Sequence, residues 1–172
     1  MLTKGGKLET VLNRFRKQVI DGSRKQLKLQ KKNAFGKLSK SLDSNLEIFK
    51  NSFSLSFSME EYGIYQDKGV SGTKKKYNTP FSYTTKRPPA NKLDKWTVKR
   101  GIAPRDDKGR FITRKGLNFI IARSIFEKGI KPSLFFTKPF EKAFKKLPND
   151  IVDLFALDVE EFIAFSLKNK RL

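Results

Sequence analysis

The net charge is the feature that most constrains what this chain can fold into. It has 38 Lys and Arg side chains against 17 Asp and Glu and no histidine, so its formal charge is +21 over 172 residues. Charges of one sign repel one another in a compact state, so such a chain needs a polyanion or acidic neighbours close by. Hydrophobic residues make up 37% of the sequence, and this content excludes a wholly disordered basic tail.

Two absent residue types exclude most catalytic chemistry. The chain has no Cys, which removes disulfides, thiolate nucleophiles and Cys-ligated zinc. It has no His, which removes the usual general base and the commonest transition-metal ligand. We therefore expect no enzyme, no cofactor and no metal site. There is also no apolar run of about 18 residues, so we expect no membrane contact and a protein made in a cytoplasm.

The charge is distributed unevenly along the chain. Residues 1–50 hold 13 basic and 4 acidic side chains, and residues 51–116 hold 15 and 6. Residues 117–172 hold only 10 and 7, and residues 149–167 within them contain five carboxylates and no basic residue. Such a polarised protein can pair head to tail with copies of itself.

The N-terminal third is expected to be helical. Its first apolar residues recur at helical spacing between Leu8 and Val19. Asp21-Gly22-Ser23 is expected to weaken or break this helix. A second stretch follows from Ser23 to about Phe49, and the two stretches together predict two helices or one long bent helix.

Alternation of apolar residues with serine predicts a strand from Ser52 to Met59. The stretch from Gln66 to Ala90 is expected to be irregular, and its aromatic residues indicate that it docks on something. Further helices are expected over residues 91–100, 114–128, 138–147 and 149–167, with Thr113 capping the second of them and a turn at Asp107-Lys108-Gly109.

We expect an α+β fold, in which a small antiparallel sheet is packed by helices. Its N-terminal segment, residues 1–50, would be basic and helical, and its C-terminal helix acidic and amphipathic. Residues 51–172 would form the α+β domain, with a loop and helical insertion at 66–129.

Basic residues flank the aromatic part of the irregular stretch. We expect them to contact DNA phosphates or a neighbouring ring, with Tyr77, Phe81 or Tyr83 stacking or wedging. The alternative is a charged loop that is merely solvated. The basic residues concerned are Lys74, Lys75, Lys76, Lys86 and Arg87.

Carboxylates could hold Mg²⁺ without histidine, as in a metal-dependent nuclease. Candidate ligands are Glu60, Glu61 and Asp67, or the pair Asp106-Asp107. Adjacent residues of a strand point to opposite faces, which argues against the Glu pair as a joint site. A nuclease is therefore the least favoured alternative.

Two short segments resemble the tail-completion or neck proteins of tailed bacteriophages. The first is Tyr62-Gly63-Ile64-Tyr65-Gln66-Asp67-Lys68-Gly69, in which an aromatic pair precedes an acidic residue and a glycine. The second is the proline and aromatic segment from Ile130 to Phe140. The similarity covers residues 45–70 and 130–167, whereas residues 71–129 depart from the pattern. The segment from Trp96 to Ile102 is similar to virion proteins of crAss-like phages.

The resemblance implies a structural virion protein of the head–tail connector, located in the tail or neck region. Such proteins form multi-copy rings below the portal, around the DNA channel, and a twelvefold ring would match the portal. Implied partners are further copies of the chain, the portal, other connector or tail rings, and packaged DNA. Tyr62, Tyr65, Asp67 and Gly69 would be signature positions. The alternative from another class is a free nucleic-acid-binding accessory protein.

Overall fold

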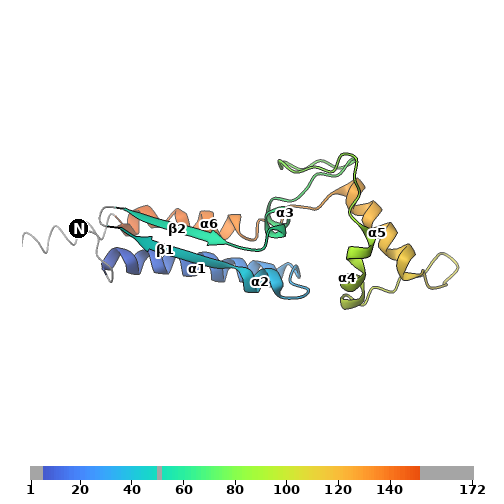
Figure 1. Ribbon diagram of the computed structural model, residues 1–172, viewed down its shortest axis with the longest axis horizontal. Helices are drawn as coiled ribbons and strands as arrows, with labels where there is room; N and C mark the ends of the chain where they lie inside the picture. Colours follow the sequence, from blue (N-terminus) through green and yellow to red (C-terminus); the bar gives the residue numbers. More distant parts are fainter. Residues whose placement is uncertain (1–5, 50–51, 152–172) are drawn as a thin grey trace, which may run out of the picture. The chain divides into compact units, whose positions relative to one another are not determined.

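The computed structural model describes residues 6–49 and 52–151 (Figure 1). The chain forms two compact units, each built from stretches that are distant in sequence. Unit 1 comprises residues 1–26, 41–59 and 135–172, and unit 2 comprises residues 27–40 and 60–134. The elements confirm the predicted α+β class, with helices and one antiparallel strand pair. No helix of the described residues is both long and apolar enough to cross a bilayer.

Unit 1 combines two helices with a β-hairpin. Helix α1 spans Lys7–Leu29 and has its last turn in unit 2, and helix α6 spans Thr137–Phe144. Strands β1 (Asp43–Ile48) and β2 (Phe53–Ser58) pair antiparallel, with Asp43 opposite Ser58 and Ile48 opposite Phe53. Figure 1 shows the hairpin running alongside α1 and α6.

Aromatic rings fill the core of unit 1. The buried apolar residues of α1 meet Ala143 and Leu147, and the half-buried Phe57 of β2 packs against them. The ring of Phe15 lies edge-on to Phe57, 6.2 Å between centroids, and to Phe140, at 5.7 Å. The β2 serines are exposed while Leu55 and Phe57 turn inward, so the predicted strand and its alternation are confirmed.

The predicted break at Asp21-Gly22-Ser23 is wrong, because α1 continues through it to Leu29. Gly22 lies where α1 and α6 approach closely, since a Cβ built there would be 2.9 Å from Cβ of Pro139. The hydroxyl of Ser23 is buried and donates to the carbonyl of Val19 at 2.7 Å, so it is satisfied inside the helix. Tertiary packing therefore overrides the low helix propensity of these residues.

The predicted helical content of residues 23–49 is also partly wrong. After α1 the chain turns through Lys31 in the left-handed region, at φ 53°, and forms only a short helix α2, Lys37–Ser41. Residues 43–48 are strand β1 instead. Two guanidinium groups of α1 hold this end of the strand: Arg24 donates to the carbonyl of Leu42 at 3.0 Å and Arg16 to that of Ser44 at 3.4 Å.

Unit 2 contains the four remaining helical elements. They are α3 (Tyr62–Lys68), the 3-10 turn η1 (Ala90–Leu93), α4 (Asp94–Lys99) and α5 (Arg114–Lys128). The predicted bounds of α5 are confirmed: the hydroxyl of Thr113 accepts from the amide of Gly116, and Gly129 ends the helix at φ 74°. The helical turn of α3 was not part of the sequence prediction.

A buried polar network joins α4 to α5. The hydroxyl of Thr97 donates to the carbonyl of Asp94 at 2.8 Å and lies 3.1 Å from Oδ1 of Asn118. The amide of Asn118 donates back to the carboxylate of Asp94 at 3.2 Å. Each of these polar groups has a partner, so the contact fixes how the two helices pack.

The predicted irregular stretch is confirmed from Gly69 onward, and it is followed by η1. The predicted turn is confirmed by the Arg105–Phe111 bridge and by Gly109 at φ 77°. The predicted insertion at 66–129 lies wholly within unit 2, whereas the division at residue 50 stays a prediction. The last predicted helix, residues 149–167, lies outside the described residues from position 152 onward.

Candidate polyanion-binding surfaces

The first segment that carries the phage resemblance lies in unit 2 against the start of the second, residues 130–134. The carbonyl of Asp67 accepts from the amides of Ser133 at 3.1 Å and Leu134 at 3.0 Å. Val70 and Ile130 exchange two backbone hydrogen bonds, of 2.9 and 2.8 Å. The side chain of Asp67 is only 3% exposed. This α3 junction therefore joins parts of the chain more than 60 residues apart.

Gly69 permits the close approach in this junction. It adopts φ 77°, and a Cβ there would lie 2.6 Å from the carbonyl oxygen of Ile130 and 2.7 Å from the Pro132 ring. Only glycine fits both the conformation and the space. The predicted signature residues Asp67 and Gly69 are thus structural, while Tyr62 and Tyr65 remain about half exposed at the surface.

The irregular stretch docks on the C-terminal end of α5. The amide of Thr73 donates to the carbonyl of Phe126 at 2.9 Å. The amides of Lys74 and Lys75 both donate to the carbonyl of Glu127, at 2.9 and 3.1 Å. These bonds satisfy carbonyls that a helix leaves unpaired at its end. The expectation that this stretch docks on something is met within unit 2 itself.

The predicted basic residues of this stretch do not act alike. The ammonium of Lys74 pairs with the Glu127 carboxylate at 2.9 Å, and Arg123 binds the other oxygen of the same carboxylate at 2.9 Å. The two hydrogen bonds from Lys74 and Arg123 lower the pKa of Glu127 below its ordinary value. Lys76 and Lys86 are exposed. Lys74 is therefore a structural contact, and DNA contact by the others stays a prediction.

Aromatic side chains of the stretch pack within unit 2. The ring of Phe81 lies edge-on to that of Tyr65 at 4.7 Å, and Tyr83 lies 6.2 Å from Phe126. Burial raises the pKa of Tyr83. The ammonium of Lys75 lies 5.6 Å from the centre of the Tyr77 ring. These contacts leave the exposed lysines, rather than stacked aromatics, as the surface that a polyanion would meet here.

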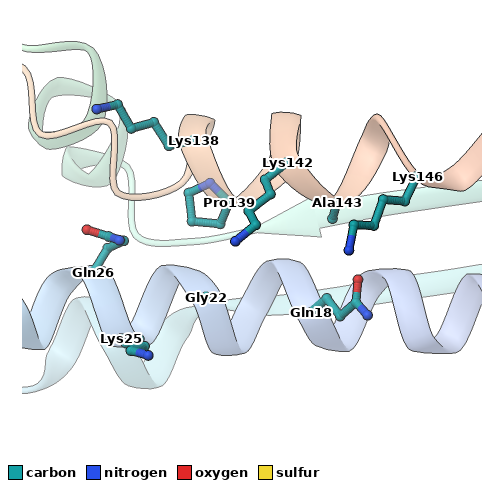
Figure 2. Close-up of a pocket in the computed structure, with 9 residues that line it drawn as sticks. All are labelled: Gln18, Gly22, Lys25, Gln26, Lys138, Pro139, Lys142, Ala143 and Lys146. Atoms are coloured by element: carbon teal, nitrogen blue, oxygen red, sulfur yellow. The ribbon is translucent and has the colours of Figure 1, made fainter.

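Unit 1 contains a basic groove that the sequence reading missed. It lies between α1 and α6, with a volume of about 450 Å³. Figure 2 shows Lys142 of α6 and Lys146, just after that helix, reaching toward α1, with Pro139 lying over Gly22 between the helices. Among its described lining residues none is acidic. We call it the lysine groove, and its residues are Gln18, Gly22, Lys25, Gln26, Lys138, Pro139, Lys142, Ala143 and Lys146.

A signal for this groove exists in the sequence. Lys138 and Lys142 lie four residues apart and so share one side of α6, and Lys146 follows at the same spacing just after the helix ends. Phe140 is offset from these lysines and packs against the core, and its ring stacks at 5.7 Å on that of the half-exposed Phe144. The fourth lysine, Lys25, comes from α1 and could be assigned only from the structure.

A second basic cluster, in unit 2, has a structural explanation. Lys28 and Lys31 at the end of α1 meet Lys99 and Arg100 at the end of α4 around a cavity of about 310 Å³. The guanidinium of Arg100 donates to the carbonyl of Lys31. Cations at helix C-termini offset the negative end of the helix dipole, and this contact also satisfies a carbonyl there. The cluster therefore serves two helix ends.

Two of the carboxylates proposed for a nuclease, Glu60 and Asp106, are engaged in other contacts. Glu60 pairs with Lys37 at 3.0 Å, and this hydrogen bond raises the pKa of Lys37. The Asp106 carboxylate pairs with Arg110. The hydrogen bond that it accepts from the Arg110 backbone amide is the main cause that lowers the pKa of Asp106. In residues 6–49 and 52–151, no three acidic side chains are grouped so that they could hold a metal ion.

Comparison of the chain with protein-family models, with curated proteins and with solved structures finds no match in any of the three.

Proposed function

We propose that the protein is a non-enzymatic structural component of a phage head–tail connector, in which copies form a ring that contacts packaged DNA through the lysine groove. The observation that carries this proposal is the groove itself, where four lysines from α1 and from α6 and its C-terminal end line one surface without a carboxylate among the described lining residues. The virion location and the portal as a partner come from the sequence resemblance.

The size of the groove suits a nucleic-acid backbone. An α-helix rises about 1.5 Å per residue, so Lys138 and Lys142 are separated by about 6 Å along α6. Duplex DNA carries one phosphate charge per roughly 1.7 Å of its axis, so about three to four charges lie along that length. Contacts of this kind depend on charge rather than on base sequence, which suits a channel through which any sequence passes.

Exposed apolar side chains support assembly into a multi-copy structure. Isolated apolar residues on a surface need no explanation, but many large ones in a small chain indicate surfaces that a partner covers. Both units carry such residues. Among the described residues they are Leu29, Phe35, Phe49, Phe53, Tyr62, Ile64, Tyr65, Val98, Ile102, Phe111, Phe119, Ile120 and Phe144.

The α3 junction supports the resemblance to neck proteins. Residues 62–69 and 130–140 carry the similarity, and the contacts at Asp67, Val70 and Ile130 bring them together. Two segments that form one packed contact are more informative than two unrelated matches.

The DNA contact is tested by the salt dependence of binding. The variant Lys138→Gln/Lys142→Gln/Lys146→Gln should flatten the slope of log K against log salt by about 2.7, at about 0.9 per phosphate contact. Between 50 and 200 mM salt, that difference corresponds to about a 40-fold change in affinity. Fluorescence anisotropy with a labelled duplex measures the slope.

The matched control replaces three exposed lysines outside the groove. Lys40→Gln/Lys92→Gln/Lys108→Gln removes the same charge from the chain, and these side chains are exposed. If both triple variants flatten the slope equally, net charge and not the groove determines binding, and the proposed DNA contact is wrong.

The second candidate is a free nucleic-acid-binding accessory protein, which the lysine groove would serve equally well. A chain that binds duplex DNA through the groove but remains small and ignores the portal would favour this alternative. A metal-dependent nuclease is the third, and it requires Mg²⁺-dependent DNA cleavage that is lost on changing Glu60, Glu61 or Asp67.

A further inference from the structure

Helix α5 is apolar on two sides, although unit 2 covers only one of them. Leu117, Asn118 and Ala122 are buried against the rest of unit 2. Phe119 and Ile120, on the outward side, are 51% and 52% exposed. Large apolar side chains that lie next to each other on an exposed helix face indicate a surface that a partner covers. The outward face of α5 therefore has the character of an interface.

This face has basic surroundings. The guanidinium of Arg87 lies 5.2 Å from the centre of the Phe119 ring. Residues 86–115, which include η1, α4 and the first residues of α5, hold 11 basic side chains against 3 acidic ones. An occupant of the face should therefore combine apolar side chains with negative charge.

The chain itself contains a segment of that chemistry. Residues 149–167 hold five carboxylates and no basic residue, and the rest are mostly apolar. This segment begins at the end of the described part of unit 1, and 21 residues follow Ile151. No other stretch of the sequence of this length is free of basic residues.

We propose that residues 149–167 of one copy bind the outward face of α5 of a second copy. Apolar side chains such as Phe155 and Phe162 would cover Phe119 and Ile120, and the carboxylates would meet the basic residues around them. A contact between two different surfaces repeats from copy to copy and closes into a ring when the rotation permits. This inference rests on the proposed ring and identifies its subunit contact.

Two full-length variants test the contact by complementation. The face variant is Phe119→Ser/Ile120→Ser, and the segment variant is Phe155→Ser/Phe162→Ser. Each variant alone should be monomeric by light scattering, where the unchanged chain forms larger species. An equimolar mixture should form a 1:1 dimer and no larger species, because only one intact face and one intact segment can meet.

Two controls keep the result interpretable. Lys17→Ser/Lys40→Ser changes two exposed side chains away from both proposed surfaces and should leave assembly unchanged. Circular dichroism must show that both double variants keep the helical content of the unchanged chain. Raising the salt concentration should weaken the 1:1 dimer, because its charged groups lie at the surface.

Several outcomes would overturn the contact. They are a mixture that stays monomeric, variants that assemble like the unchanged chain, and an unchanged chain that is itself monomeric at high concentration. The proposed function fails separately, if the groove variant keeps its salt slope or if portal never recruits the chain. If the face variant and the segment variant both still assemble into a ring on the portal, the contact is wrong and the proposed ring function still holds.

Discussion

Replacing Gly69 by alanine should destabilise unit 2 far more than the same change at Gly109. Both residues adopt φ 77°, a conformation that costs an alanine about 1–2 kcal/mol. Gly69 also has ψ 177°, in a region that almost only glycine adopts, so the backbone cost there is at least as large. Their surroundings differ. A Cβ at Gly109 meets nothing within 4 Å, whereas one at Gly69 lies 2.6 Å from the Ile130 carbonyl oxygen and 2.7 Å from the Pro132 ring.

The close packing of the α3 junction adds a cost at Gly69 that is absent at Gly109. Carbon atoms in contact prefer about 3.5–4.0 Å, so the segment at Pro132 would have to move by about 1 Å. Overpacking of this kind costs about 1–3 kcal/mol. Gly109→Ala should therefore lose about 1–2 kcal/mol of unfolding free energy and Gly69→Ala about 2–5 kcal/mol.

Urea unfolding followed by circular dichroism measures both losses. Amide exchange of Val70 and Ile130, whose amides bond across the junction, should also accelerate in Gly69→Ala and not in Gly109→Ala. Equal losses in the two variants would refute the reasoning, because the segment from Ile130 to Pro132 would then accommodate a methyl group without cost.

Three further predictions concern single contacts. Gly22→Ala should destabilise unit 1 despite a gain of about 1 kcal/mol in helix propensity, because its Cβ would lie 2.9 Å from Cβ of Pro139, and Pro139→Gly in the same chain, which removes that atom, should rescue it in a thermal double-mutant cycle. Thr97→Val should cost about 1–3 kcal/mol in urea unfolding by leaving buried polar partners unpaired, and a smaller loss would show that the network adapts. The lowered pKa of Glu127 means that its contribution is present above the ordinary carboxyl pKa and lost as pH falls through the folded value. The stability deficit of Glu127→Gln at pH 7 should therefore shrink at pH 3 in thermal melts, and a constant deficit would contradict the role of its ion pairs with Lys74.

Local signals in the sequence were sufficient for some elements. The ends of α5 were predictable from Thr113 and Gly129, because an N-cap side chain and a C-terminal glycine with positive φ each act within one helical turn. The strand β2 was predictable because its serines alternate with apolar residues. Both signals depend only on neighbouring residues, so no tertiary contact is needed to read them.

Other elements depend on contacts between distant residues. Strand β1 reads Asp-Ser-Asn-Leu-Glu-Ile, which has little strand propensity, and pairing with β2 determines its conformation. The passage of α1 through Gly22 depends on Pro139, more than 100 residues later. The lysine groove likewise requires Lys25 and the α6 lysines to come together, and the role of Lys74 was hidden because Glu127 lies 53 residues away.

The mass of the protein in solution tests the central claim most directly. Light scattering after nuclease treatment should be measured at low and high salt, with and without the portal protein. A connector ring predicts a discrete multi-copy mass, or a monomer that becomes a ring only when portal is present. A persistently small species that binds duplex DNA and ignores portal would contradict the account and favour the accessory protein.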